Sequence, residues 1–87
     1  MNLEQLRIFL KVAEHKSFTK AAESMYISHS TTSRNVAALE ADIGTRLMKR
    51  NNRSVHLTAA GELLYKKGSE LIESIEALED ELRNADE

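Results

Sequence analysis

The chain has 87 residues, enough for one compact domain but close to the size at which a single core is marginal without a partner, a metal or disulfides. It has no cysteine, no signal-peptide pattern at its start and no run of roughly 20 apolar residues, so we expect a cytoplasmic protein without disulfides, thiolate metal sites or a membrane partner. The net charge of −2 is split along the chain, since residues 1–68 carry eleven Lys/Arg and six Asp/Glu whereas residues 69–87 carry one arginine and eight acids.

The absence of proline and the small number of glycines favour helix over most of the chain. A first helix is predicted over residues 3–15, because Asn2 and Gln5 can form a capping box at its start. Its apolar residues recur at helical spacing and are Leu3, Leu6, Phe9, Leu10 and Ala13. A second helix is predicted over residues 18–25 with Ser17 as its cap. Its narrow apolar stripe consists of Phe18, Ala21, Ala22 and Met25.

A third helix is predicted from its cap, Ser28, to about Ile43, with Gly44 in the left-handed conformation that often ends helices. Only about three residues separate it from the second helix, and so short a link forces the two helices to cross steeply, as in a helix-turn-helix. The residues expected on its core face are Thr32, Val36, Leu39 and Ile43. The residues expected on its outer face are Ser30, Arg34, Ala37 and Ala41, with Ser33 at the edge.

This outer face is polar in its first turns and has no bulky apolar group, as expected of a helix whose N-terminal end enters the major groove of DNA. Small hydroxyl residues allow close approach, and Arg34 can reach a phosphate or a guanine edge. The alternative is that Ser, Thr and Asn only decorate a solvent-exposed first turn.

Two short strands are predicted at residues 47–49 and 55–57, with turn-forming residues at 50–54 between them. Four cations fall within eight residues here: Arg46, Lys49, Arg50 and Arg53. A hairpin directly after a helix-turn-helix is a wing, and an arginine at its tip suits the negative potential of a narrow minor groove. The alternatives are an ordinary polar hairpin and a basic cluster that only aids solubility.

A single long helix is predicted from its cap, Thr58, to about Ala85, a length of about 40 Å. Its apolar residues at heptad spacing are Leu64, Leu71, Ile75, Leu78 and Leu82, with Gly61 and Gly68 on the same seam. Packing back on its own domain is the alternative and would use Leu63, Leu64 and Leu71, whereas the last three apolar residues of the seam lie too far out. We therefore expect these residues to pair the helix with a second copy, while the acidic residues form a solvated face.

Together these residues resemble the N-terminal DNA-binding domain of LysR-type transcriptional regulators. The fragments that carry the resemblance are Leu3-Glu4-Gln5-Leu6, Ser17-Phe18-Thr19-Lys20-Ala21-Ala22, Ile27-Ser28, Ser33-Arg34, Leu39-Glu40, Ile43-Gly44, Leu47, Arg50, Arg53 and Leu57-Thr58-Ala59-Ala60-Gly61. The resemblance implies a mainly α fold. Residues 1–58 would form a winged helix-turn-helix domain (helix-turn-helix about 18–37, short β-hairpin wing about 46–57), and residues 59–87 a linker helix for dimerisation.

The resemblance also implies partners and contacts. The partners are operator DNA in double-stranded form and a second copy held through the linker helices, with higher oligomers in the full-length protein. A small-molecule effector would bind only a C-terminal domain, which does not follow here, so the chain looks like a fragment. The candidate DNA-binding residues are Thr19, Lys20, Ser28, His29, Ser30, Thr31, Ser33, Arg34, Arg50 and Arg53.

Two departures from the family pattern leave the base preference open. The family usually has Gln-Pro where this sequence has His29-Ser30, and it often has arginine where this sequence has Ala37-Ala38. His29 either donates to a guanine acceptor or covers the helix end. Ser33 and Arg34, by contrast, match the family's DNA-contacting positions directly.

An enzyme is not supported, because the three histidines are far apart in sequence and there is neither a glycine-rich phosphate loop nor a Ser-His-acid constellation. No catalytic residue, cofactor or metal site is predicted. We expect a sequence-specific, dimeric DNA-binding regulator. The alternative is a helix-turn-helix module for protein interaction and dimerisation that does not bind DNA, which leaves Arg34, Arg53 and the basic cluster without a role.

Overall fold

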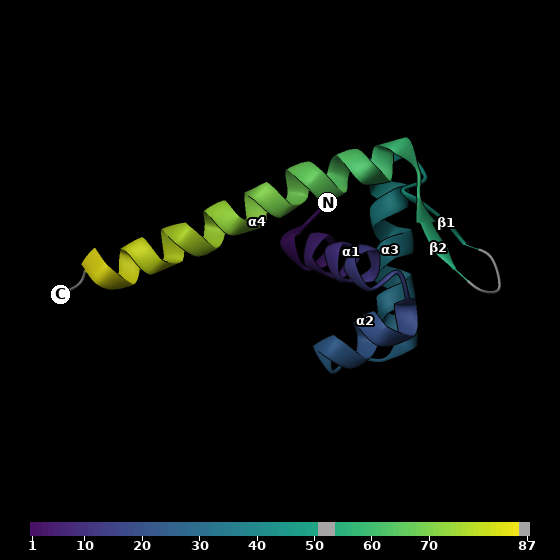
Figure 1. Ribbon diagram of the computed structural model, residues 1–87, viewed down its shortest axis with the longest axis horizontal. Coiled ribbons are helices and arrows are strands. Elements are labelled where there is room, and N and C mark those ends of the chain that lie inside the picture. The colour runs from purple at the N-terminus through teal and green to yellow at the C-terminus, as the bar shows by residue number, and fades with distance from the viewer. Residues whose placement is uncertain (51–53, 86–87) are drawn as a thin grey trace.

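The structure, a computed structural model, describes residues 1–50 and 54–85. Its elements in chain order are α1 (Leu3–His15), α2 (Phe18–Met25), α3 (His29–Ile43), β1 (Met48–Arg50), β2 (Val55–Leu57) and α4 (Ala59–Ala85). The first three helices, the hairpin and the start of α4 form a compact body, and the rest of α4 projects from it (Figure 1), so the molecule measures 51 × 26 × 19 Å. The predicted mainly α fold, a winged helix-turn-helix followed by a long helix, is confirmed.

Capping side chains set the helix boundaries. At α1, the amide of Gln5 donates to Oδ1 of Asn2 at 2.8 Å, and the amide of Asn2 donates to Oε1 of Gln5 at 3.2 Å, which completes the predicted capping box. The hydroxyls of Ser17 and Ser28 accept hydrogen bonds from backbone amides in the first turns of α2 and α3. Gly44 ends α3 with φ +77°. The predicted bounds of these three helices are confirmed.

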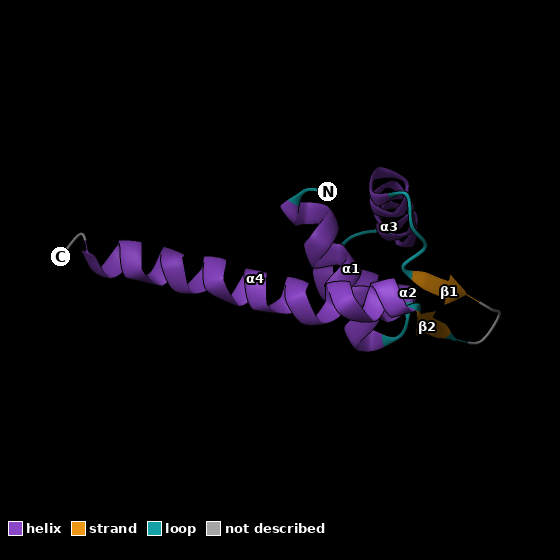
Figure 2. Cartoon of the chain, turned by 90° about the horizontal axis from the view of Figure 1, so that it is seen from above, coloured by secondary structure: helices purple, strands orange, loops and turns teal. Residues whose placement is uncertain are grey.

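The turn between α2 and α3 brings both helices against α1 (Figures 1 and 2). Tyr26 ends α2 in the left-handed conformation, with φ +57°, and its backbone N–H lies within hydrogen-bonding reach of two carbonyls in the last turn of α2. The chain therefore changes direction within residues 26–28, and α2 and α3 cross steeply (Figure 1). The apolar residues buried between the three helices are Ile8, Phe9, Val12, Ala21, Val36 and Leu39. Burial of a large apolar side chain stabilises the fold by about 1.5–3 kcal/mol.

Two residues assigned to core-facing stripes are not in the core. Ile43 is 43% exposed and Leu3 is 48% exposed. Leu47 and Met48, which were predicted only as strand residues, are instead 1% and 0% exposed and belong to the core. After the turn at Gly44 the chain returns to the body and inserts these two side chains, so the core does not depend on the last turn of α3.

The hairpin pairs β1 and β2 in antiparallel register, with Met48 opposite Leu57 and Arg50 opposite Val55. Strand β2 has the predicted bounds, whereas β1 begins one residue later than the predicted strand 47–49. The expected tip of the wing lies outside the described residues, because residues 51–53 are not among them.

Glu40 of α3 binds the backbone at the start of the hairpin. Its Oε2 accepts hydrogen bonds from the backbone amides of Leu47 at 2.8 Å and Met48 at 3.4 Å, and it lies 3.5 Å from Nε of Arg46. The Glu40 side chain is only 12% exposed, so these bonds satisfy a largely buried carboxylate. The sequence analysis gave Glu40 no such role. It fixes the hairpin to the C-terminal half of α3.

The first half of α4 packs on the body through two glycines. A Cβ at Gly61 would lie 1.9 Å from the carbonyl oxygen of Leu47, and a Cβ at Gly68 would lie 2.8 Å from Cδ1 of Leu6. Both glycines are buried, as is Ile72. These glycines therefore allow α4 to approach Leu47 and Leu6 of its own chain closely.

The apolar residues of α4 form two neighbouring stripes, one against the body and one exposed. Leu64 packs against the core of its own body and Ile75 is partly buried, so part of the predicted dimerisation seam contacts its own chain. A second stripe is more than half exposed and consists of Leu63, Leu71, Leu78 and Leu82. The alternative in which Leu63 and Leu71 pack back on the domain is not observed, because both side chains are exposed and Ile72 is buried instead. Within residues 1–50 and 54–85, no helix combines the length and the apolar character that a membrane span needs.

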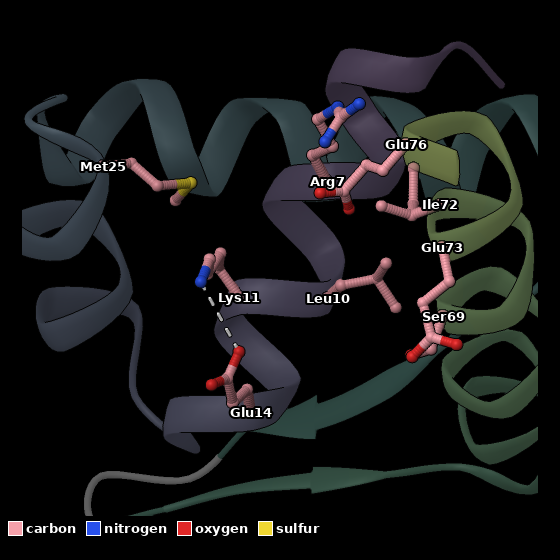
Figure 3. A pocket seen from close by; sticks show the side chains of 9 residues that line it. All are labelled: Arg7, Leu10, Lys11, Glu14, Met25, Ser69, Ile72, Glu73 and Glu76. Atoms are coloured by element: carbon pink, nitrogen blue, oxygen red, sulfur yellow. Dashed lines mark ion pairs between the residues drawn. The ribbon is translucent and has the colours of Figure 1, made fainter. Parts of the chain in front are cut away.

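A groove of about 470 Å³ runs between α1, the end of α2 and α4 (Figure 3). Leu10 and Ile72 contribute apolar surface to it. Its charged lining comes from both long helices, namely Arg7, Lys11 and Glu14 on α1 and Glu73 and Glu76 on α4. Lys11 pairs with Glu14 on its own helix at 3.7 Å.

Candidate nucleic-acid interface

The first turns of α3 present a polar surface to solvent. His29, Ser30 and Arg34 are exposed, and Thr31 and Ser33 are partly buried. The opposite side of the helix contributes Thr32, Val36 and Leu39 to the interior, each at 0% exposure, and Ala37 and Ala41 continue the exposed side. Apart from Ile43, α3 has the two faces predicted from its sequence.

Hydrogen bonds within α3 already engage some of the predicted contacts. The Ser28 hydroxyl accepts from the Thr31 amide at 3.0 Å and donates to Oγ1 of Thr31 at 2.9 Å, so it caps the helix. Nη2 of Arg34 donates to the same Oγ1 at 3.4 Å. A guanidinium has five N–H donors, so this bond leaves Arg34 able to reach an anion.

The start of α2 and the hairpin flank this surface. Thr19 and Lys20 are exposed in the first turn of α2, and Arg50 is exposed at the end of β1. Figure 1 places the hairpin beside α3, on the side away from the projecting end of α4. The acid-rich end of α4 is therefore distant from the cations of the helix-turn-helix. Arg53, the predicted tip residue, lies outside the described residues.

Arg50 is tied to the helix-turn-helix by contacts that the sequence analysis did not predict. Its Nη1 donates to Oγ of Ser33 at 3.0 Å, and its guanidinium carbon lies 4.2 Å from the ring centroid of Phe18. The His29 ring lies 5.9 Å from the same phenyl ring, with the two planes at 48°. Phe18 thus joins the hairpin to the start of α3. Both Phe18 and Arg50 fall within the fragments of the family resemblance, but no periodicity pairs residues so far apart in sequence.

Cations, hydroxyl donors and the positive ends of two helix dipoles converge here, an arrangement suited to phosphate and to the acceptors of base edges. Within the ranges that the structure describes, no group of three or more His, Cys, Asp or Glu side chains could hold a metal ion. The described side chains of this surface offer hydrogen-bond donors and positive charge.

Comparison with known sequences gives a consistent result. Residues 3–62 match the family model described as bacterial regulatory helix-turn-helix protein, lysR family. The chain is 38% identical over 84 residues to the HTH-type transcriptional regulator PtxR of Pseudomonas aeruginosa, which covers 97% of this chain and 27% of that protein. It is 47% identical over 64 residues to the transcriptional activator IlvY of Salmonella typhimurium, covering 74% of this chain and 22% of that protein. The chain thus spans about a quarter of the length of these relatives.

Solved structures of similar chains include complexes with DNA. The BenM DNA-binding domain bound to catB site 1 DNA has a TM-score of 0.95 and 32% identity, covering 98% of this chain and 96% of that chain. The CbnR DNA-binding domain in its DNA complex has a TM-score of 0.94 and 33% identity, with full coverage of both chains.

Proposed function

The chain belongs to the lysR family of bacterial regulatory helix-turn-helix proteins, and on this premise we propose that it is the DNA-binding part of a dimeric, sequence-specific transcriptional regulator. Double-stranded operator DNA is its proposed partner, and we propose that it acts in the cytoplasm. Effector binding would belong to a further part of a longer regulator, as the resemblance implies. Catalysis has no part in this proposal.

The observation that carries the proposal is the polar N-terminal end of α3, which is exposed between the first turn of α2 and the hairpin. His29, Ser30 and Arg34 are available to base edges or phosphates there, and no large apolar side chain of the outer face obstructs a groove. The similarity of the chain to two DNA-binding domains in complex with DNA supports a role in DNA binding for this surface. A module used only for protein interaction would not require this concentration of donors and cations.

Dimerisation is proposed through the exposed stripe of α4. Leu71 and Leu78 are each 53% exposed, and burying them against a second copy would stabilise a dimer. If two such helices cross antiparallel near Ser74, Leu71 faces the partner's Leu78 and Lys67 faces the partner's Glu81. In a parallel pair, Lys67 would face Lys67 of the second copy and Glu81 would face Glu81. Like charges would then meet, which is unfavourable. The charges therefore favour the antiparallel pair.

Binding to DNA should be strongly salt-dependent. Each phosphate neutralised by a cation contributes a slope of roughly −0.9 to the plot of log K against log salt concentration, so several contacts per chain should give a steep line. The measurement is a salt titration with operator DNA chosen by the protein from a random duplex library. A nearly flat line would favour the module that does not bind DNA.

Arg34→Ala and Lys66→Ala form a matched pair for this titration. Both residues are exposed cations, but Arg34 lies on α3 and Lys66 lies on α4. We expect Arg34→Ala to weaken binding by about 1–3 kcal/mol if it contacts a guanine, and Lys66→Ala to have little effect. Equal losses of affinity for the two variants would mean that DNA binding depends only on the total charge of the protein. In that case α3 would not be the recognition element.

The residues at the start of α3 should influence base preference. Replacing His29-Ser30 by Gln-Pro, the pair usual in the family, exchanges the hydrogen-bonding groups at two exposed positions in the first turn of α3. We expect the bases selected in each half-site to change while the spacing between half-sites stays the same. Repeating the binding-site selection with this variant tests the expectation. An unchanged selected sequence would mean that these two positions are not read.

A further inference from the structure

The contacts of Arg50 are unlike those of an arginine whose only task is to meet a phosphate. Its guanidinium lies 4.2 Å from the centroid of the Phe18 ring, and the same group donates to Oγ of Ser33 at 3.0 Å. A planar guanidinium can stack on a ring and donate in its own plane at the same time, which an ammonium group cannot do. The site therefore requires arginine for its shape as well as its charge.

We propose that Arg50 is a positioning residue for DNA recognition, a role that rests on the proposed function. It fixes the hairpin to α2 and α3, and it orients the hydroxyl of Ser33 as a hydrogen-bond donor toward DNA. Since Oγ of Ser33 accepts a bond from a cation, its O–H is directed elsewhere and becomes a stronger donor. Phosphate oxygens and the acceptors of guanine are the groups that such a donor meets.

Phe18 is the common anchor in this arrangement. It is 7% exposed and belongs to the hydrophobic core, so its ring is held by packing. Arg50 stacks on this ring from the hairpin, and the His29 ring approaches it to 5.9 Å from the first residue of α3. The hairpin and the start of α3 are thereby held relative to one buried ring. Holding them before DNA arrives reduces the ordering that binding requires.

The substitution Arg50→Lys distinguishes a positioning role of Arg50 from an ordinary phosphate contact. Lysine retains the charge but not the stacked, planar geometry, so we expect Arg50→Lys to weaken operator binding about tenfold with an unchanged salt slope. Lys49→Ala, which removes the preceding cation of β1, is the control for charge alone. The positioning role is overturned if Arg50→Lys binds like the parent while Arg50→Ala lowers the salt slope by about 0.9 per chain, because that is the behaviour of a phosphate contact.

Double variants test whether the three side chains act as a unit. In a Ser33→Ala background, Arg50→Lys should cost much less than about tenfold, because the bond that it disturbs is already gone. Phe18→Leu should reduce the effect of Arg50→Lys in the same way, once circular dichroism has confirmed that this variant is folded. If Phe18→Leu does not fold, the Ser33 background decides by itself. Losses that simply multiply in these backgrounds overturn the proposal.

An NMR measurement without DNA separates this proposal from the proposed function. The ring current of Phe18 should shift the side-chain protons of Arg50, and Arg50→Lys should shift the amide signal of Ser33 but leave that of Ala85, at the end of α4, unchanged. An Arg50 side chain with ordinary shifts overturns the positioning role. A parent protein that binds no duplex DNA overturns the proposed function, and the role of Arg50 in recognition with it.

Discussion

Gly61→Ala should strongly destabilise the protein, although alanine is the better helix former. Helix propensity alone would make the substitution favourable by about 1 kcal/mol. The added Cβ, however, would lie 1.9 Å from the carbonyl oxygen of Leu47, a backbone atom that also accepts the amide hydrogen bond of Thr58 at 3.0 Å. Relief of the clash must move α4 away from the start of the hairpin. We expect a net loss of about 2–4 kcal/mol in the free energy of unfolding.

Gly68→Ala is the matched control for this substitution. It lies on the same helix and is also buried, but its Cβ would meet the end of the Leu6 side chain at 2.8 Å, and a side chain can rotate away. We expect a change of at most about 1 kcal/mol, because the gain in helix propensity offsets part of the repacking cost. Urea unfolding at one fixed protein concentration compares the variants. A Gly61→Ala protein as stable as its parent would mean that α4 does not pack on the start of the hairpin.

Replacing Leu71 and Leu78 with glutamate should separate the dimer while each body stays folded. Both side chains lie in the exposed stripe of α4, and the buried residues of the body lie elsewhere. A separated monomer loses the gain in effective concentration that comes from two linked half-sites, so affinity for a full operator should fall by about 10²- to 10⁴-fold. Sedimentation gives the mass, and titration of operators gives the affinity.

Ala77→Glu combined with Asn84→Glu adds the same two charges on another exposed side of α4 and should leave the dimer intact. Operators whose half-sites are displaced by half a helical turn provide a second measurement, because a rigidly held pair of recognition helices should discriminate against them. If the Leu71 and Leu78 double variant sediments as a dimer, or if the parent binds every spacing equally, α4 does not set the separation of the two bodies.

The orientation of the pair can be measured because the parent has no cysteine. In an antiparallel dimer, Lys67→Cys and Glu81→Cys proteins should be joined by a short thiol crosslinker when they are mixed, and neither should be joined to itself. In a parallel dimer each variant would crosslink with its own copy. The products are distinguished by mass spectrometry, and crosslinking of each variant alone would contradict the charge argument.

The sequence by itself determined the helices and their ends. Caps such as Asn2, Ser17 and Ser28 act on amides three residues away, and Gly44 supplies a backbone conformation that few residues adopt. These are local interactions, so a linear pattern is enough to find them. The family resemblance also located the exposed end of α3, although the roles of its individual side chains in binding DNA stay predictions.

The tertiary structure decided which of several apolar residues enter the core and which groups meet at the hairpin. Ile43, Leu47 and Met48 are all apolar, and their burial depends on where the chain turns back after α3. The Glu40 carboxylate under the hairpin and the stacking of Arg50 on Phe18 join elements distant in sequence. No periodicity records such contacts, because they arise only when the elements pack in three dimensions.

The same distinction applies to α4. Its heptad pattern predicted one seam, but the helix divides its apolar residues between its own body, through Leu64 and Ile72, and a separate exposed stripe that includes Leu71 and Leu78. The two sets lie close together around the helix, so spacing alone could not separate them. What separates them is the approach of α4 to α1 and Leu47, which the absence of a side chain at Gly61 and Gly68 makes sterically possible.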